Sequence, residues 1–530
     1  MRLGIDFGTT RIVVAAVDRG NYPVVAFDTP GGASQDWCPS LIAIAGAERL
    51  YGWQAWAAQE RPDITVIRSI KRFLADAGPD TRVEIASQSI PMLELLTGLT
   101  TGLREALYDS SSLQIQRGEP LEIMLGVPAN ANGNQRFLTV EAFGRAGFHV
   151  LGLLNEPSAA SIEYGHGLRA KQEAKPRDVI LVYDLGGGTF DASLVELEEH
   201  RHSVLFSEGI PTLGGDDFDE ILSDLALDAA KTPEHVRESL TQAEWFRLHE
   251  ECRLKKEGIH PNTRRIVLEL ETVREGWPTV TIPIGDFHER CQALIDETLH
   301  AVDDLIKGCD RPLEAVYMTG GASEMPVVSR SLREKYGRRV RRSSFTRSAT
   351  AIGLAIQSDA QAGYLLRDKF TRNFGVWREA EAGHMIVFDP LFLKGTVLPA
   401  VGEEPLRVMR RYYPAHNLGD FRYLECSHMS EDGRPTGEVA VWDEILFPFD
   451  GQLQSHADLS RVPVVREECA PPRLVEEAYS CDASGAVTVT ISNLTEGYRR
   501  DYRLGRWAVK EAPVVPAMKK RRAARKAASK

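Results

Sequence analysis

The chain has 530 residues, of which 43% are hydrophobic and 26% are charged. Hydrophobic cores stop growing at about 250 to 300 residues, so these values predict several folded domains and exclude a wholly disordered protein. The net charge of -12 disfavours broad binding to nucleic acid or to anionic membranes. No apolar run approaches the roughly 20 residues that span a bilayer, and the chain starts with a strand pattern, so we expect a cytoplasmic protein.

The first 358 residues have the pattern of an α/β unit. Apolar strands such as Leu3–Asp6 and Val179–Asp184 alternate with helical patterns, and one helix is expected near Gln135–Ala146. A charged, helix-periodic stretch covers residues 218–258, and a further helix is expected over Phe287–Ile306. This alternation predicts sheets covered by helices.

The pattern changes after residue 358. Residues 359–373 are typical of a linker, and residues 374–507 contain short strands separated by Gly, Pro and Asp turns. The clearest strand is Val487–Ile491, which is apolar on one face. We therefore expect a mostly β, sandwich-like domain. Residues 508–530 hold the basic run Lys519–Lys526 and are predicted to be a disordered basic tail.

One motif with an aspartate, a glycine turn and a threonine occurs twice. The copies are Asp6-Phe7-Gly8-Thr9-Thr10 and Asp184-Leu185-Gly186-Gly187-Gly188-Thr189. Glycines let backbone N–H groups approach an anion, threonine hydroxyls add donors, and an aspartate can hold hydrated Mg²⁺ beside a phosphate. A single copy is more typical of a hairpin, but the repeat favours two phosphate-binding loops. The sequence has no GxxxxGK[ST] motif, which excludes a P-loop enzyme.

Several further blocks, in this order, resemble the heat-shock protein 70 (Hsp70, DnaK-type) chaperone family. They are Ile70-Lys71-Arg72, Gly126–Ala129, Leu154–Ala160, Leu213–Asp219 and Thr319–Gly321. The resemblance implies an actin-like duplicated ATPase domain with ribonuclease-H-like halves over residues 1–358. It also implies an interdomain linker over 359–373 and a β-sandwich-like substrate-binding domain over 374–507. The implied function is that of an ATP-dependent chaperone, in which hydrolysis of Mg-ATP is coupled to polypeptide binding.

The resemblance also implies roles for single residues. Catalysis would fall to Lys71, Glu156, Asp184 and Thr189, while Asp6 and Asp184 would hold Mg²⁺ through water. ATP or ADP would be bound by Asp6, Gly8, Thr9, Thr10, Gly186, Gly187, Gly188, Gly214, Gly215, Asp216, Lys256, Gly320, Gly321 and Ala322. Pro128, Arg136 and Asp368 would form the relay from the nucleotide to the linker. Val376 would line the peptide groove, although a place in the ordinary sandwich core is the alternative.

The adenosine end of the implied site departs from the family pattern. Arg253 stands where the family usually has Glu, and Glu324 stands where it usually has an arginine that lies on adenine. These two changes are reciprocal in charge, so we expect a salt bridge of reversed direction. A carboxylate cannot stack on adenine as a guanidinium does, which predicts weaker binding of the base. His260 and Arg347 replace the usual Ser and Asp.

The expected partners are unfolded or extended polypeptide segments, and the resemblance also allows a nucleotide exchange factor. Gly152 stands where the family carries a basic residue that docks J-proteins, so we expect no stimulation by a generic J-protein. Only 23 residues follow Trp507, from which we expect a member without the helical lid. We expect no membrane partner and no nucleic acid, apart from contacts of the basic tail.

Two other functions remain open for such a fold. A small-molecule kinase would need a carboxylate base beside a sugar-sized pocket. An actin-like filament protein would self-assemble. Neither function predicts a β domain that follows a linker.

Overall fold

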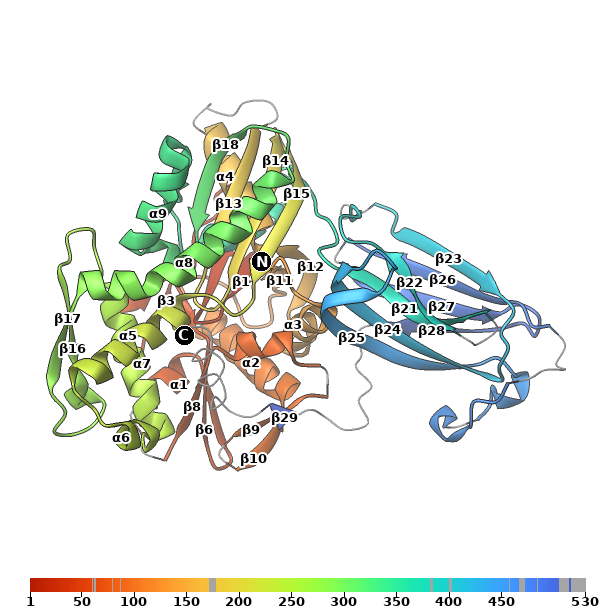
Figure 1. Ribbon diagram of the computed structural model, residues 1–530, viewed down its shortest axis with the longest axis horizontal. Coiled ribbons are helices and arrows are strands. Elements are labelled where there is room, and N and C mark those ends of the chain that lie inside the picture. Colours follow the sequence, from red (N-terminus) through yellow and green to blue (C-terminus); the bar gives the residue numbers. More distant parts are fainter. Residues whose placement is uncertain are drawn as a thin grey trace.

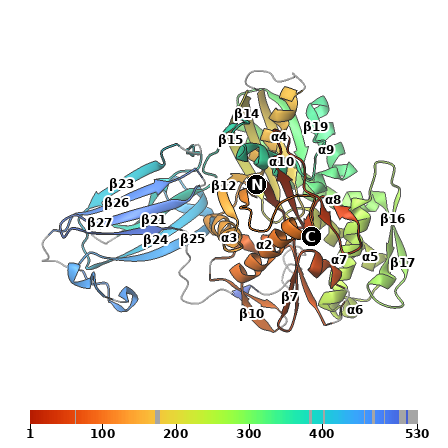
Figure 2. The same ribbon diagram turned by 180° about the vertical axis from the view of Figure 1, so that it is seen from behind.

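The computed structural model describes residues 1–504 and 514–515, apart from 60, 62, 79, 86, 171–177, 382–384, 400–402, 457, 467–471 and 484. Figure 1 shows an α/β part built around two sheets and a β part that extends from it to one side, and Figure 2 shows the same arrangement from behind. No helix in the described ranges is long and apolar enough to cross a membrane.

The first sheet of the α/β part has the strand order β12-β11-β1-β2-β5. Its strands are β1 (Arg2–Phe7), β2 (Arg11–Ala16), β5 (Cys38–Pro39), β11 (Glu122–Val127) and β12 (His149–Asn155). Strand β1 pairs antiparallel with β2 and parallel with β11, which pairs parallel with β12. The predicted strand at Leu3–Asp6 is confirmed as part of β1, in which Leu3 and Ile5 are fully buried.

The second sheet repeats this arrangement, with the order β19-β18-β13-β14-β15-β20. Its strands are β13 (Asp178–Leu185), β14 (Phe190–Glu198), β15 (Arg201–Ile210), β18 (Leu313–Thr319), β19 (Val340–Arg342) and β20 (Leu365–Arg367). Strand β13 pairs antiparallel with β14 and parallel with β18, which pairs parallel with β19. Strands β13, β14, β18 and β19 therefore correspond to β1, β2, β11 and β12 in order and direction. The two loops with the repeated motif lie at equivalent places, between β1 and β2 and between β13 and β14.

Two helices made largely of small residues join the halves. Helix α4 (Glu156–Ala170) packs against α10 (Ala349–Ser358), which also packs against β1. A Cβ atom added to Gly353 would lie 1.8 Å from the backbone oxygen of Ala159, and one added to Gly4 would lie 2.2 Å from the backbone nitrogen of Ala355. Glycine is therefore required at both positions for the backbones to approach so closely.

Further elements extend each half. In the first half they are β3 (Phe27–Asp28), β4 (Ser34–Gln35), β6 (Leu41–Ala45), β7 (Glu48–Tyr51), α1 (Trp53–Ala57), β8 (Thr65–Arg68), the 3₁₀ helix η1 (Ile70–Ala75), β9 (Arg82–Ile85), β10 (Gln88–Pro91), α2 (Met92–Asp109) and α3 (Gly133–Arg145). In the second half they are α5 (Gly215–Ala229), α6 (Glu234–Glu238), α7 (Gln242–Glu257), β16 (Arg265–Glu269), η2 (Leu270–Thr272), β17 (Thr279–Pro283), α8 (Ile284–Lys307), η3 (Gly321–Glu324), α9 (Pro326–Tyr336) and η4 (Gly337–Arg339). The helices predicted near Gln135–Ala146 and Phe287–Ile306 are confirmed as α3 and α8.

The β part consists of two antiparallel sheets that enclose one core. The first has the order β22-β21-β24-β25 and the second has the order β23-β26-β27-β28. Their strands are β21 (Asn373–Ala380), β22 (Met385–Phe392), β23 (Leu406–Tyr412), β24 (Leu418–Met429), β25 (Pro435–Pro448), β26 (Val475–Cys481), β27 (Val487–Asn493) and β28 (Tyr498–Arg503), with short 3₁₀ turns η6 (Gly451–Leu453) and η7 (Leu459–Arg461). The alternation predicted for Val487–Ile491 is confirmed, because Val487, Val489 and Ile491 are fully buried.

The structure corrects two expectations and adds detail to a third. Val376 is fully buried in the core of the β part, so it packs in the sandwich interior as the alternative proposed and does not line an open groove in this structure. Within the segment expected to be the linker, Leu365–Arg367 form β20 and pair parallel with β15. Most of the tail lies outside the described residues. Its two described residues, Val514–Val515, form β29 against β9 where disorder was predicted.

The close contact of α4 with α10 leads to a prediction about stability. The variant Gly353→Ala places a methyl group against the backbone of α4, which must shift, so the free energy of unfolding should fall by about 1 to 3 kcal/mol. The matched control is Gly144→Ala in α3, where a Cβ has open space and should leave stability unchanged or raise it by about 1 kcal/mol. Urea denaturation of the two variants measures both effects. Equal midpoints for Gly353→Ala and the wild type would contradict this packing.

Candidate functional site

The two motif loops face each other across a cleft between the halves. A Cβ atom added to Gly187 would lie 2.3 Å from the hydroxyl oxygen of Thr10, and one added to Gly188 would lie 2.6 Å from the Thr9 methyl carbon. A third loop joins them, because the backbone nitrogens of Gly215 and Asp216 donate to the carbonyl oxygens of Gly186 and Gly187, at 2.9 and 2.7 Å. Side chains larger than hydrogen would fill the space between these loops. The backbone can therefore approach an anionic ligand here.

A second close approach lies at the start of η3. Gly320 has a φ of 85°, and a Cβ at this position would lie 2.4 Å from Oδ1 of Asp184. Both the backbone conformation and the space therefore require glycine.

A buried ion pair lies at the base of the cleft. Lys71, in η1, is 4% exposed, and its Nζ donates to Oε1 of Glu156 at 2.5 Å. Burial alone would lower the pKa of Lys71, but the charges of Glu156 and Asp6 leave this pKa raised above its usual value. The lysine therefore stays positively charged.

Carboxyl groups crowd around this lysine. Burial, with the charge of Glu156 next, raises the pKa of Asp6 to about 7 and raises the pKa of Asp184 well above its usual range. Burial and Glu156 likewise raise the pKa of Asp191 to about 7. Burial is the larger cause of these shifts, and the neighbouring carboxylate charges add to it although Lys71 opposes them. A divalent cation would relieve that repulsion, and carboxylate oxygens are the ligands that Mg²⁺ prefers, so these residues fit a magnesium ion. Among the described residues, no three His, Cys, Asp or Glu side chains are arranged to hold a metal directly.

The cleft contains a cavity of about 140 Å³ that brings together most of the predicted site residues. Those lining it are Asp6, Gly8, Thr9, Thr10, Lys71, Glu156, Asp184, Gly186, Gly187, Thr189, Gly215, Asp216, Lys256, Gly320, Gly321 and Ala322. Gly188 and Gly214 do not line it. They pack behind the loops, where a Cβ on Gly214 would lie 2.6 Å from the backbone nitrogen of Gly188. Lys256 is anchored by the carbonyl oxygen of Gly215 at 2.5 Å and by Asp219 at 2.7 Å.

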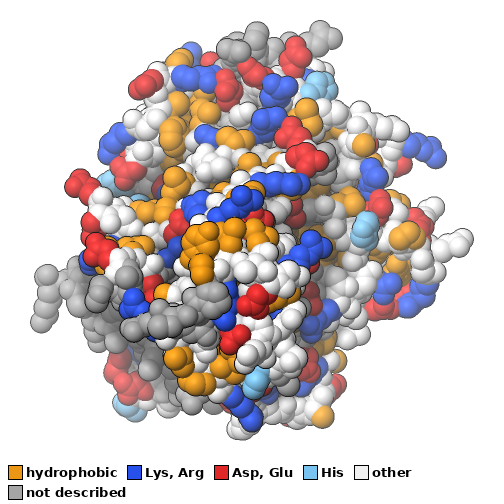
Figure 3. Space-filling model, turned by 90° about the vertical axis from the view of Figure 1, so that its right-hand side faces the viewer, with side chains coloured by type: hydrophobic (Ala, Val, Ile, Leu, Met, Phe, Trp, Pro, Cys, Tyr) orange, Lys and Arg blue, Asp and Glu red, His pale blue; other side chains and the backbone are white. Residues whose placement is uncertain are grey.

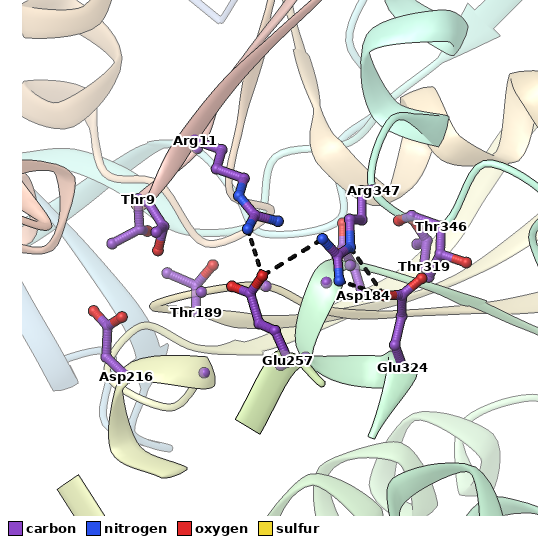
Figure 4. Close-up of a pocket in the computed structure, with 18 of the residues that line it drawn as sticks. Thr9, Arg11, Asp184, Thr189, Asp216, Glu257, Thr319, Glu324, Thr346 and Arg347 are labelled. Carbon is purple, nitrogen blue, oxygen red and sulfur yellow. Dashed lines mark hydrogen bonds and ion pairs between the residues drawn. The ribbon is translucent and has the colours of Figure 1, made fainter. Parts of the chain in front are cut away.

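The expected salt bridge between Arg253 and Glu324 is not formed at the far end of the cavity. Arg253 pairs instead with Glu250 and, at 2.9 Å, with Glu257. Glu324 pairs with Arg347 at 2.7 Å and with Arg342 at 2.8 Å. Arg347 and Glu257, whose Nη1 and Oε2 atoms lie 3.6 Å apart, link the ion pairs of Arg253 to those of Glu324 (Figure 4). His260 is exposed in the turn after α7 and does not line the cavity.

A short polar path leads from the cleft to the linker. Asn155 and Glu156 are neighbours at the junction of β12 and α4. Glu156 contacts Lys71, while the side-chain nitrogen of Asn155 donates to Oδ2 of Asp368 at 2.6 Å. Arg136 donates to the other side of Asn155, at 2.6 Å. Burial raises the pKa of Asp368, although the backbone N–H of Lys369 and the charge of Arg136 oppose this shift.

The other members of the predicted relay lie near this path. The carbonyl oxygen of Pro128 accepts a hydrogen bond from the backbone N–H of Ala131. The side chain of Arg136 donates to the carbonyl oxygen of the same Ala131. The backbone N–H of Ala129 donates to Asp191 at 2.9 Å, beside the cleft. Gly152 lines a second cavity, of about 370 Å³, together with Arg136 and Asp368.

The β part docks on the first turn of α3. Glu425 of β24 accepts a hydrogen bond from the backbone N–H of Gly133 at 2.9 Å, where the helix dipole favours a carboxylate. The indole of Trp442 packs so closely on Gly133 that a Cβ there would lie 1.4 Å from its nitrogen. Arg136, three residues after Gly133 in the same helix, belongs to the polar path. The same helix therefore contacts both the β part and the polar path.

Sequence reasoning missed several residues of the site. Asp191 lies two residues after the second motif, which was its only local signal. Arg72, quoted only as part of a motif, donates to the carbonyl of Gly188 at 3.0 Å and pairs with Asp217 at 2.5 Å. Arg11 and Glu257 pair across the cleft at 2.5 Å, from β2 and α7. They are 246 residues apart, and no local pattern connects them.

Comparisons with a family model and with curated proteins point to the same family. A family model described as Hsp70 protein matches residues 116–371. The chain is 32% identical over 384 residues to a chaperone protein HscA homolog of Vibrio vulnificus, and 31% identical over 382 residues to a chaperone protein HscA of Enterobacter. It is 29% identical over 376 residues to an HscA homolog of Colwellia psychrerythraea. Each match covers 68% of this chain and 58% of the relative, so the chain matches less than two thirds of their length.

The bond between Asn155 and Asp368 leads to a prediction about the linker. Removing a buried acceptor typically costs about 1 to 3 kcal/mol, so Asp368→Ala should speed amide hydrogen exchange of Leu365–Arg367 roughly tenfold or more. The control is Arg367→Ala, because Arg367 is 44% exposed and makes a surface ion pair with Glu403, which contributes about 0 to 1 kcal/mol. Exchange that is unchanged in Asp368→Ala would show that this bond does not hold the linker.

Proposed function

Because the chain belongs to the Hsp70 family, we propose that it is an ATP-dependent chaperone-like protein that couples hydrolysis of Mg-ATP to polypeptide binding. The observation that carries this proposal is the polar path from Lys71 through Glu156 and Asn155 to Asp368. It joins the cleft to the segment that precedes the β part. We assign residues 1–358 to an actin-like nucleotide-binding domain, 359–373 to the linker and 374–507 to a substrate-binding domain.

The chemistry of the cleft suits phosphoryl transfer, which asks a protein mainly for positioning and charge neutralisation. The backbone N–H groups of Gly187 and Thr189, which line the cavity, and the hydroxyls of Thr9 and Thr10 would hold phosphate oxygens. The N–H of Gly186 instead closes the second motif loop by donating to the carbonyl oxygen of Thr189 at 3.0 Å. Mg²⁺, held through water by Asp6 and Asp184, would neutralise phosphate charge when bound. Lys71 is fixed by Glu156 and would stabilise charge at the γ-phosphate. Together with Glu156 and Thr189 it would orient the attacking water.

The β part offers apolar surface for an extended polypeptide. Strand β22 is at an edge of its sheet, and its residue Ile386 is 68% exposed. Tyr413 and Met409 are 65% and 52% exposed. Figure 3, which faces the β part, shows apolar side chains gathered near the middle of this side. Edge strands bind extended chains through backbone hydrogen bonds, and exposed apolar patches mark interaction sites.

A small-molecule kinase and an actin-like filament protein are less favoured. Neither function needs a linker strand in the second sheet or a carboxylate of the β part at the first turn of α3. Both features suit a protein in which the nucleotide site and a second binding site influence each other.

Removing the amine of Lys71 tests the catalytic assignment. In Lys71→Ala the cleft loses a fixed charge that stabilises the transition state, so steady-state ATP hydrolysis should fall by about 10² to 10³ while ATP still binds. Lys307→Ala, at an exposed position on α8 outside the cavity, is the control and should hydrolyse ATP at the wild-type rate. A Lys71→Ala rate within about twofold of the wild type would exclude the assigned role.

Stimulation of hydrolysis by polypeptide tests the proposed function itself. We expect the ATPase rate of the full chain to rise when a reduced, carboxymethylated protein is added. Ile386→Ser should weaken this rise by removing apolar contact on β22, whereas Val267→Ser should not. Val267 is 46% exposed but belongs to β16 of the α/β part, which makes it a matched control. A wild-type rate that does not respond to any concentration of unfolded polypeptide would contradict the coupling.

A further inference from the structure

One end of the cavity is walled by charged side chains. Figure 4 shows Thr9 and Thr189 of the phosphate loops on one side, and Glu257, Arg347 and Glu324 on the other. All five residues line the same cavity. A nucleotide whose phosphates lie against the loops would place its base toward the charged end.

Arg347 lies between the two carboxylates of this wall. Its Nε and Nη2 contact Oε2 of Glu324 at 2.9 and 2.7 Å, and its Nη1 lies 3.6 Å from Oε2 of Glu257. The N–H bonds of a guanidinium lie in its plane, so these contacts use its edge and fix its orientation. The two flat faces make no hydrogen bonds. Despite these ion pairs the side chain is 36% exposed.

The other arginines that pair with Glu257 already pack against aromatic rings. The guanidinium of Arg11 lies 4.6 Å from the ring centre of Trp37, and that of Arg253 lies 5.6 Å from the ring centre of Trp56. No ring lies against Arg347 in the part of the chain that the structure describes. Arg347 lines the cavity and keeps 36% of its side chain exposed, so a ligand in the cavity can reach it.

Glu257 keeps its charge in this arrangement. Burial alone would raise the pKa of Glu257, but the charges of Arg11 and Arg253 lower it to about 2. The carboxylate therefore remains an ion pair partner of Arg347 at all pH values near neutrality.

We propose that Arg347 determines the affinity for the nucleobase by stacking a flat face of its guanidinium on the base, with Glu324 and Glu257 as positioning residues. The sequence alone assigned the loss of a stacking arginine to position 324. The carboxylate at that position instead holds another arginine over the cavity. Stacking between a cation and an aromatic ring is strong enough to alter nucleotide affinity roughly tenfold.

This inference rests on the proposed binding of nucleotide and is tested with two ligands. The probes are ATP and inorganic tripolyphosphate, which has the phosphate chain but no base, each titrated with Mg²⁺ by calorimetry. The decisive variant is Arg347→Lys, which keeps the charge but removes the flat surface. We expect ATP to bind it roughly tenfold more weakly than the wild type, and tripolyphosphate to bind within about twofold.

The matched control is Arg342→Lys. Arg342 pairs with the same carboxylate of Glu324 at 2.8 Å but does not line the cavity, so both ligands should bind this variant as they bind the wild type. If Arg347→Lys binds ATP as tightly as the wild type, or loses both ligands equally, the stacking role is wrong. If the wild type binds neither ligand, the proposed nucleotide function fails first and the inference fails with it.

Discussion

The architecture depends on one junction, where β12 ends at Asn155 and α4 begins at Glu156. Consecutive residues at this turn send their side chains to two different sites, Glu156 to the buried lysine of the cleft and Asn155 to the linker aspartate. Both contacts are buried, so neither partner can be replaced by water without loss of free energy. A change in the position of one side chain must therefore be accommodated by the other. One strand end therefore contacts both the cleft and the segment that precedes the β part.

The two ends of the cavity differ in how their charges are balanced. At the two motif loops, several buried carboxyl groups surround Lys71, and burial with the charge of Glu156 raises the pKa of Asp6 to about 7. Such a cluster suits a site completed by a cation. At the other end, carboxylates and arginines alternate in an almost continuous chain of ion pairs from Arg11 to Arg342, through Glu257, Arg347 and Glu324. The charges at that end are already paired with one another. The surface proposed to contact a ligand there is the flat face of the Arg347 guanidinium.

The sequence predicted the features that depend on local patterns. The strands that carry Asp6 and Asp184, the glycine turns after them and the alternation in β27 follow from residues that are close in the chain. Features set by contacts between distant segments could not be predicted. The linker pairs with β15 some 160 residues earlier, as in Arg201 with Leu365. The burial of Val376 depends on a second sheet, and the partners of Arg253 and Glu324 depend on how helix α7 and the loop before α10 meet. The opposite charges of Arg253 and Glu324 did not indicate that Glu257 and Arg347 lie between them.

The central claim is that the junction at Asn155 transmits the state of the cleft to the linker. The most direct measurement is amide hydrogen exchange of Leu365–Arg367 in the wild type and in Asn155→Ala, each without nucleotide and with saturating ATP or ADP. The account predicts that exchange in the wild type depends on the nucleotide, and that in Asn155→Ala this dependence disappears while ATP affinity is retained. A full nucleotide response in Asn155→Ala would contradict the claim, because the signal would then pass through another contact.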